Sequence, residues 1–268
     1  MKIKNQKFLE NIEKKGILNQ IFSTKYVENQ IFSTFAANMR QIPNITKNLL
    51  IINIICYMAK MVLGGRIDFD GLFGLHFFLA QDFHLHQLLT YMFMHASFTH
   101  LFFNMFALWM FGGTVERIFG EKRYLIYYIV CGLGAAVCQE ISQFVQIYAM
   151  LPSEVSIDQM FHLSYADKLM LNGFTTVGAS GSVYGILLAF GMSYPEERIF
   201  IFPLPVPIKA KWFVILYAAI ELGSALTSRG DGVAHVAHLG GMLFGYILIK
   251  FWRKTSDTFN GWDGYEIR

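Results

Sequence analysis

Six apolar segments dominate this 268-residue sequence and limit what the chain can fold into. A helix needs about 20 mostly apolar residues to cross the hydrocarbon core of a bilayer. Hydrophobic residues make up 54% of the chain and charged residues only 15%, whereas about 25% of the residues of a soluble domain are charged. We therefore predict an all-α polytopic membrane protein with six transmembrane helices, at about 48–64, 98–116, 124–145, 180–194, 211–227 and 235–251.

Basic residues are distributed unevenly between the loops. Six spans place both termini on one side of the membrane, and that side carries 18 of the 22 Lys and Arg residues, against three on the other. Because cytoplasmic loops collect Lys and Arg, both termini are predicted to be cytoplasmic. The predicted organisation is a cytoplasmic N-terminal segment at 1–47, a six-helix membrane domain at 48–253 and a cytoplasmic C-terminal tail at 254–268.

Other classes of protein fit the sequence less well. The Lys-rich first 45 residues lack the apolar core of a cleaved signal peptide. The net charge of +3 reflects the basic cytoplasmic side and is no argument for nucleic-acid binding. Cys56, Cys131 and Cys138 lie inside predicted spans without CxxC spacing, which is typical of small core residues and not of a metal or redox site.

Ser180 lies in Gly178-Ala179-Ser180-Gly181, at the start of the shortest apolar segment. A helix from Ser180 to Tyr194 rises about 21 Å, which is less than the roughly 30 Å of the hydrocarbon core. This helix must therefore begin roughly 10 Å below the outer surface of the membrane. Such a depth requires protein or a water-filled cavity around the preceding loop.

Two other segments carry polar residues at a similar depth. His238 lies twelve residues before Lys250, and Asn104 lies twelve residues before Glu116, so both stand about 18 Å above the cytoplasmic end of their helix. His100 lies one turn above Asn104 on the same helix face. By these estimates, the polar residues of three different helices lie at nearly the same depth in the membrane.

The residue types at this plane suit acyl transfer. A serine hydroxyl becomes a nucleophile when a base, usually His, accepts its proton. The oxyanion that forms needs donors such as Asn, His or backbone N–H groups. The sequence thus predicts a serine hydrolase with Ser180, His238, His100 and Asn104 in a site inside the membrane, and with Tyr184 placed to pack against an imidazole.

Two glycine pairs explain how these helices could approach. Gly181 and Gly185 follow the serine, and Gly241 and Gly245 follow His238. Small residues four apart permit close backbone contact between membrane helices. Close contact is what a Ser–His hydrogen bond requires.

These motifs, in this order, resemble those of the rhomboid family of intramembrane serine proteases in its bacterial six-helix form. The resemblance covers residues 95–245, more than half of the chain. It rests on His95-x4-His100-x3-Asn104, on Gly112-Gly113-Thr114-Val115-Glu116-Arg117, on Gly178-Ala179-Ser180-Gly181-Ser182-Val183-Tyr184-Gly185 and on Ala237-His238-x2-Gly241-x3-Gly245.

The resemblance implies a role for each residue that matches. Ser180 would be the nucleophile and His238 the general base of a dyad, with Tyr184 stacked on His238. His100, Asn104 and the Ser180 N–H would form the oxyanion hole. His95 would help order the top of the second helix, and Glu116 would anchor its cytoplasmic end. The resemblance further implies that the protein uses no cofactor and cleaves transmembrane proteins. Because the resemblance is to the bacterial form, the expected location is a bacterial inner membrane.

Some features depart from the family pattern. Residues 65–97 contain no Trp, although many members carry a Trp-Arg pair in this loop, and the loop at 151–177 is long. Glu221 lies inside the fifth span, a helix often proposed as the lateral substrate gate, and is expected to line the water cavity or to act as a polar latch. No acid is obviously placed to orient His238, which agrees with a dyad.

Two other functions remain open. A catalytically silent rhomboid-like protein could bind membrane clients, although it would need neither Ser180 nor His238. A metal-dependent membrane protein could use His95, His100, His235 and His238. However, no His-Glu-x-x-His motif is present, and His235 and His238 lack a carboxylate on their turn of helix.

Overall fold

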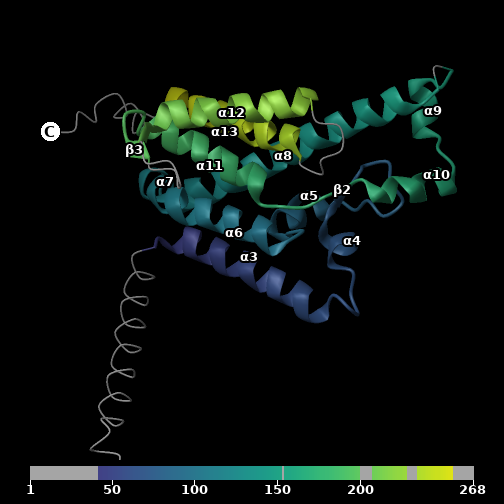
Figure 1. Ribbon diagram of the computed structural model, residues 1–268, viewed down its shortest axis with the longest axis horizontal. Helices are drawn as coiled ribbons and strands as arrows, with labels where there is room; N and C mark the ends of the chain where they lie inside the picture. The colour runs from purple at the N-terminus through teal and green to yellow at the C-terminus, as the bar shows by residue number, and fades with distance from the viewer. Residues whose placement is uncertain (1–41, 153, 200–206, 228–233, 256–268) are drawn as a thin grey trace, which may run out of the picture. The chain divides into compact units, whose positions relative to one another are not determined.

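The computed structural model describes residues 42–152, 154–199, 207–227 and 234–255. Helices predominate in these ranges (Figure 1). Most of the predicted N-terminal segment 1–47 and of the predicted tail 254–268 lies outside the described residues.

A helix lies at each of the six predicted apolar segments. Four of these helices are long and apolar enough to cross a membrane, and α11, with 14 residues, is shorter. The chain is therefore a mostly helical, polytopic membrane protein. The helices are α3 (Asn44–Leu63), α6 (Phe98–Ala107) continued by the π-helical η2 (Leu108–Gly112) and by α7 (Gly113–Phe119), α8 (Glu121–Met150), α11 (Ser180–Ser193), α12 (Ala210–Thr227) and α13 (His235–Thr255).

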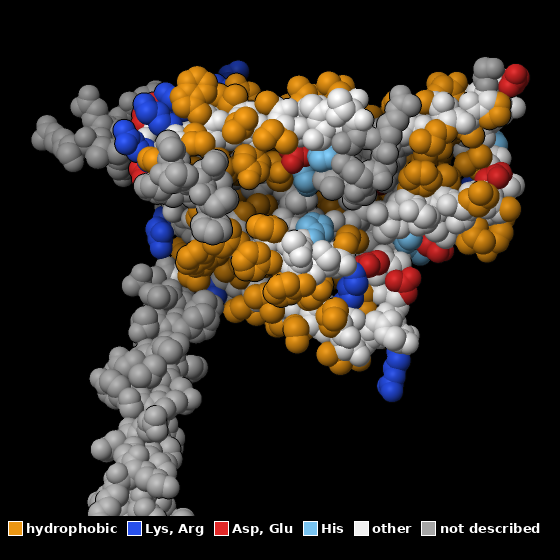
Figure 2. All heavy atoms as spheres, in the orientation of Figure 1, with side chains coloured by type: hydrophobic (Ala, Val, Ile, Leu, Met, Phe, Trp, Pro, Cys, Tyr) orange, Lys and Arg blue, Asp and Glu red, His pale blue; other side chains and the backbone are white. Residues whose placement is uncertain are grey.

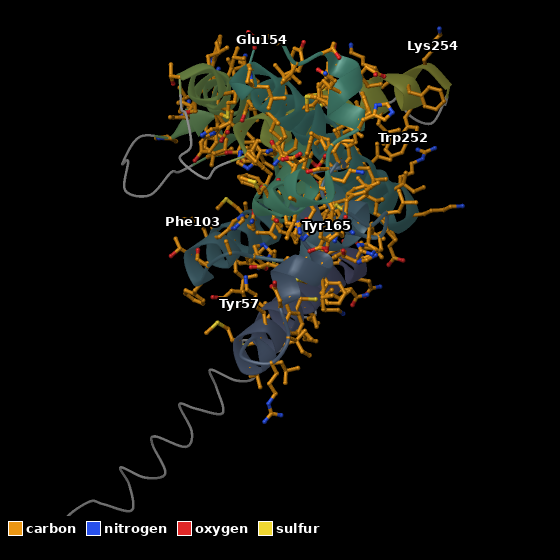
Figure 3. All side chains as sticks on the ribbon, turned by 90° about the vertical axis from the view of Figure 1, so that its right-hand side faces the viewer. Tyr57, Phe103, Glu154, Tyr165, Trp252 and Lys254 are labelled. Atoms are coloured by element: carbon orange, nitrogen blue, oxygen red, sulfur yellow. The ribbon has the colours of Figure 1, made fainter. Side chains whose placement is uncertain are left out.

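Large apolar side chains cover the outer faces of these helices (Figure 2). Phe103 of α6 is 63% exposed and projects away from the helices in Figure 3, where Tyr57 marks the outer part of α3. A soluble protein rarely exposes apolar surface on this scale. These faces suit contact with lipid tails.

The short helix α11 runs through the middle of the bundle. It packs against α8 and α13, and it also contacts α6 and α12 (Figure 1). Most of its residues are buried, including glycines and alanine that let neighbouring backbones come close. Its first residue, Ser180, is half-buried between these helices.

The two long loops, at 65–97 and 151–177, pack against one another. The loop at 65–97 forms α4 (Phe69–Phe73), β1 (Leu75–His76), α5 (Gln87–Thr90) and η1 (Tyr91–Phe93). The loop at 151–177 forms α9 (Ile157–Phe161), α10 (Tyr165–Met170), η3 (Leu171–Gly173) and β2 (Thr175–Thr176). Strands β1 and β2 pair antiparallel, with Leu75 opposite Thr176.

The sequence did not predict these strands. A second short pair, β3 (Arg198–Ile199) with β4 (Ile208–Lys209), follows α11. In that hairpin Glu196 accepts a hydrogen bond of 2.6 Å from Lys209 and another from Lys211. These two bonds lower the pKa of Glu196 to about 2.

Candidate active site

The backbone before α11 holds Ser180 at the mouth of the helix. Strand β2 is fixed by β1, and the Gly178 N–H then donates to the Tyr91 carbonyl at 2.9 Å. Gly178 has φ +135°, a conformation that side-chain-bearing residues rarely adopt. Ser180 follows as the first residue of α11, where backbone N–H groups have no partner within the helix.

Ser180 and His238 contact one another across two helices. Ser180 Oγ lies 2.8 Å from His238 Nε2. The Tyr184 ring stacks on the imidazole, with ring centroids 4.3 Å apart and planes 6° apart. His238 is buried and its orientation is fixed on two sides.

A carboxylate completes this arrangement, and the expectation that no acid orients His238 was wrong. Glu221 Oε2, on α12, lies 2.9 Å from His238 Nδ1 and 2.7 Å from His235 Nδ1. The Tyr184 hydroxyl donates to Glu221 Oε1. An ionised carboxylate only accepts hydrogen bonds, so His238 Nδ1 carries the hydrogen and Nε2 accepts from Ser180.

Glu221 could have been found from the sequence by a simple signal. It is an ionisable residue in an apolar segment, and such residues are functional by default. It also lies six residues before Thr227, about 9 Å along the helix, which puts it within a few ångströms of the predicted depth of Ser180. The missing information was the rotation of α12, which the sequence does not give because this helix is apolar on all sides.

His100 and Asn104 lie on the other side of Ser180. A Cβ placed on Gly178 would lie 2.7 Å from His100 Cε1 and 3.6 Å from Ser180 Oγ, so the His100 ring reaches the entrance of α11. Asn104 is buried one turn further along α6. Its Nδ2 has no hydrogen-bond partner among the described residues, so this donor is not occupied by another group there.

His95 supports this side from behind. It is fully buried, and its ring centroid lies 5.0 Å from that of His100 in an edge-to-face arrangement. Burial, and then the proximity of His100, lower the pKa of His95 to about 3, so the ring is neutral. The His95 carbonyl accepts from Lys60 at 2.9 Å, and Lys60 pairs with Asp70 at 2.6 Å.

Glu116 does not join the site. It is buried in α7 and accepts hydrogen bonds from the Ile45 N–H at 2.9 Å and from the N–H and hydroxyl of Thr46, both at 2.7 Å. Its carboxylate therefore holds the first turn of α3 against α7. This contact also explains why α3 begins at Asn44 and not at residue 48.

The glycine pairs lie at the helix contacts. A Cβ on Gly241 would overlap the backbone carbonyl of Gly181, so α13 and α11 touch there without side chains. Cβ atoms on Gly185 and Gly245 would overlap Cys131 and Tyr127 of α8, respectively. The glycines thus permit the close packing of α11, α13 and α8.

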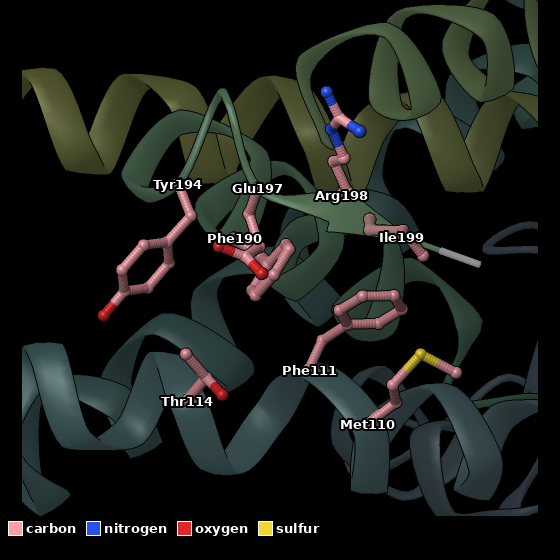
Figure 4. Close-up of a pocket in the computed structure, with 8 residues that line it drawn as sticks. All are labelled: Met110, Phe111, Thr114, Phe190, Tyr194, Glu197, Arg198 and Ile199. Atoms are coloured by element: carbon pink, nitrogen blue, oxygen red, sulfur yellow. The ribbon is translucent and has the colours of Figure 1, made fainter. Parts of the chain in front are cut away.

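A pocket of about 400 Å³ lies elsewhere, at the opposite end of α11 (Figure 4). None of the residues placed around Ser180 in this subsection lines it. Its walls are Met110, Phe111, Thr114, Phe190, Tyr194, Glu197, Arg198 and Ile199.

Comparison with known proteins points to one family. The family model described as "Rhomboid domain" matches residues 82–254, more than half of the chain. The chain is 28% identical over 214 residues to "Rhomboid protease AarA" of Providencia stuartii, covering 76% of this chain and 70% of that protein. It is 24% identical over 205 residues to "Rhomboid protease GlpG" of Haemophilus influenzae, covering 75% of this chain and 88% of that protein.

Mitochondrial proteins are also similar. The chain is 30% identical over 183 residues to "Presenilin-associated rhomboid-like protein A, mitochondrial" of Danio rerio. That match covers 66% of this chain but only 40% of the mitochondrial protein. This chain thus spans less than half of the length of that mitochondrial relative.

Proposed function

Because the chain belongs to the rhomboid family, we propose that it is an intramembrane serine endopeptidase that cleaves transmembrane proteins through an acyl-enzyme. One observation carries the proposal, the 2.8 Å contact between Ser180 Oγ and His238 Nε2 at the half-buried start of α11. Placing polar side chains among apolar helices costs free energy, so such residues usually have a function.

In the first step Ser180 Oγ attacks the carbonyl carbon of the scissile peptide bond, and its proton passes to His238 Nε2. The imidazolium then gives this proton to the leaving amine, and an acyl ester remains on Ser180. Water enters, His238 takes one of its protons, and the hydroxide attacks the ester. The Ser180 oxygen leaves and recovers its proton from His238.

The oxyanion of each tetrahedral intermediate needs donors that are already in place. The unpaired Asn104 Nδ2, the His100 ring beside Gly178 and the Ser180 N–H at the start of α11 supply them in this proposal. The positive end of the α11 dipole favours negative charge at the same point.

Glu221 acts as a positioning residue for His238. Its Oε2 accepts the hydrogen on Nδ1 at 2.9 Å, which holds the ring in the tautomer whose Nε2 can accept a proton. The negative charge also stabilises the imidazolium that forms during the reaction. The proposed site is thus a Ser–His–Glu arrangement and not a dyad.

Six membrane crossings with both termini cytoplasmic complete the proposal. The distribution of Lys and Arg supports this orientation, which puts Ser180 nearer the outer face. In a bacterium the membrane would be the cytoplasmic one. Substrates would reach Ser180 from the surrounding lipid, with no metal or cofactor taking part.

The test compares the purified protein with its Ser180→Ala and His238→Ala variants on a model transmembrane substrate. Both variants should lose cleavage. Ser180→Ala should keep the wild-type melting temperature, whereas His238→Ala, which removes one donor to Glu221, is compared per folded molecule. A fluorophosphonate should label the wild type at Ser180. Normal cleavage by the Ser180→Ala protein would rule out this nucleophile, and a folded wild type that neither cleaves nor becomes labelled would point to a silent family member.

A further inference from the structure

We propose that Glu221, His235 and His238 form a binding site for a divalent transition-metal ion of the Zn²⁺ class, and that the bound ion switches off the catalytic histidine. Each residue offers one ligand atom, and the three atoms lie within 4.8 Å of one another. The inhibitory part rests on the proposed function, whereas metal binding itself does not.

The donor set suits such an ion. Two imidazole nitrogens and one carboxylate oxygen, with a fourth position left for water, match the tetrahedral sites that Zn²⁺ prefers. His235 and His238 are three residues apart in the first turn of α13 and present Nδ1 to the same side. The sequence lacked a carboxylate near this pair, and α12 supplies it.

The distances require little rearrangement. Zn²⁺ binds nitrogen and oxygen at about 2.0–2.2 Å, so ligand atoms around it lie roughly 3.3 Å apart. Glu221 Oε2 now lies 2.7 Å from His235 Nδ1 and 2.9 Å from His238 Nδ1. These two separations need to grow by less than about 1 Å to admit the ion in place of the bridging hydrogens, and all three ligand atoms already lie within 4.8 Å of one another.

Tyr184 prepares the carboxylate for this role. Its hydroxyl donates to Glu221 Oε1, which leaves Oε2 directed at the two imidazoles. Such outer contacts orient metal ligands and raise affinity. The cluster also reaches the surface, since the His235 side chain is 14% exposed, and Figure 2 shows histidine and acidic side chains together in the middle of this face.

Metal at Nδ1 would reverse the hydrogen bond to Ser180. In the active arrangement His238 carries its hydrogen on Nδ1, and Nε2 accepts from Ser180 Oγ. When the ion occupies Nδ1, the single hydrogen of the neutral ring must move to Nε2. His238 then has no site to accept the Ser180 proton, so acylation stops without any redox step.

The binding test uses the full chain without a polyhistidine tag and with Ser180→Ala, so that activity plays no part. Titration with Co²⁺ should produce the visible absorption of a tetrahedral complex, and Zn²⁺ should displace it with one ion per chain. Loss of an outer contact costs about 10–100-fold in affinity, so loss of a ligand by His235→Ala should weaken Zn²⁺ binding by at least about 100-fold.

A matched control removes two other neighbouring histidines, His84 and His86, whose rings lie 5.6 Å apart in the outer loop. The double variant His84→Ala/His86→Ala should bind Zn²⁺ like the parent. The proposed site would be wrong if the His235→Ala protein bound Zn²⁺ as tightly as the parent. It would also be wrong if only the His84→Ala/His86→Ala protein lost saturable binding. Glu221→Gln gives a second variant if His235→Ala lowers the melting temperature.

Inhibition is measured on proteins that keep Ser180, each against its own metal-free rate. Zn²⁺ should slow fluorophosphonate labelling of Ser180, EDTA should restore it, and His235→Ala should shift the inhibitory Zn²⁺ concentration upward by at least about 100-fold. If one Zn²⁺ binds per chain but the labelling of Ser180 is not slowed, the metal site stands and the proposed inhibition is wrong. If no labelling occurs even without metal, the proposed function fails and the binding result stands alone.

Discussion

The Glu221 side chain links three helices by hydrogen bonds. Its carboxylate accepts from His238 and His235 of α13 and from Tyr184 of α11, while the residue itself belongs to α12. A buried carboxylate is strongly destabilising unless such donors surround it. The same three contacts that make Glu221 tolerable therefore fix the imidazole that would serve as the base.

Glu221→Gln should slow the chemical step, because an amide is a poorer partner for the Nδ1 hydrogen and for an imidazolium. Replacing the acid of such an arrangement by its amide costs up to about 10⁴-fold. We expect a fall of kcat for a small soluble ester with little change of KM, and partial rescue by Glu221→Asp. Unchanged ester hydrolysis with faster cleavage of a transmembrane substrate would instead identify Glu221 as a latch on α12.

His100→Ala and Asn104→Ala should each lower kcat by roughly 10²–10³, with a smaller effect on KM, because each removes one donor to the oxyanion. Steady-state kinetics on a transmembrane substrate measure both constants. Asn53→Ala is the matched control, since Asn53 is also a buried asparagine but donates to the Leu49 carbonyl within α3. Wild-type turnover in the His100→Ala/Asn104→Ala protein would contradict this assignment.

At the scale of helices, contact between α11 and α13 depends on the absence of side chains. Gly241 faces the Gly181 carbonyl so closely that a Cβ would overlap it. The overlap is with backbone, which cannot rotate away as a side chain can. A single methyl group should therefore move one helix relative to the other and lengthen the Ser180–His238 hydrogen bond.

Gly241→Ala is thus expected to lower both the melting temperature and the rate of Ser180 labelling. Gly223→Ala, in α12, is the control, since a Cβ there would meet nothing within 4 Å. Alanine stabilises a helix interior by about 1 kcal/mol relative to glycine, so the control should be neutral or slightly stabilised. Equal behaviour of the two variants would show that the α11–α13 contact adjusts freely.

For the molecule as a whole, apolar length and the rhomboid-type motifs predicted most of the helical arrangement. The family is confirmed, and helices lie at all six apolar segments. Because the rise per residue of a helix is constant, counting residues from the helix ends predicted that Ser180 and His238 lie at the same depth in the membrane. Their side chains lie 2.8 Å apart.

The short strands and the position of Glu221 could not be predicted, because they depend on contacts between distant parts of the chain. Strands β1 and β2 are two residues long, too short for any alternation to be visible, and each exists because the other pairs with it. The His238 partner of Glu221 lies 17 residues further along the chain, in the next helix. Hydropathy fixes the existence of α12 but not its rotation, so a Ser–His–Glu arrangement could not be told from a dyad.

The last prediction concerns how α3 is attached to the rest of the bundle. Glu116 binds the first turn of α3 through two backbone N–H groups and the Thr46 hydroxyl, and all of these groups are far from Ser180 along the helices. Glu116→Ala leaves buried donors unpaired, which costs at least about 2 kcal/mol. For a chain of this size that corresponds to a melting temperature lower by about 4–8 °C.

Cleavage per folded molecule, measured well below the transition, should stay near the wild-type value, because Glu116 does not contact the site. Glu121→Ala is the control, since Glu121 accepts one exposed hydrogen bond from Asn44 at the same helix end. Its loss should change the melting temperature little, because exposed polar groups can bind water instead. An unchanged melting temperature with lost cleavage in Glu116→Ala would mean that this carboxylate acts on the reaction and not on the attachment of α3.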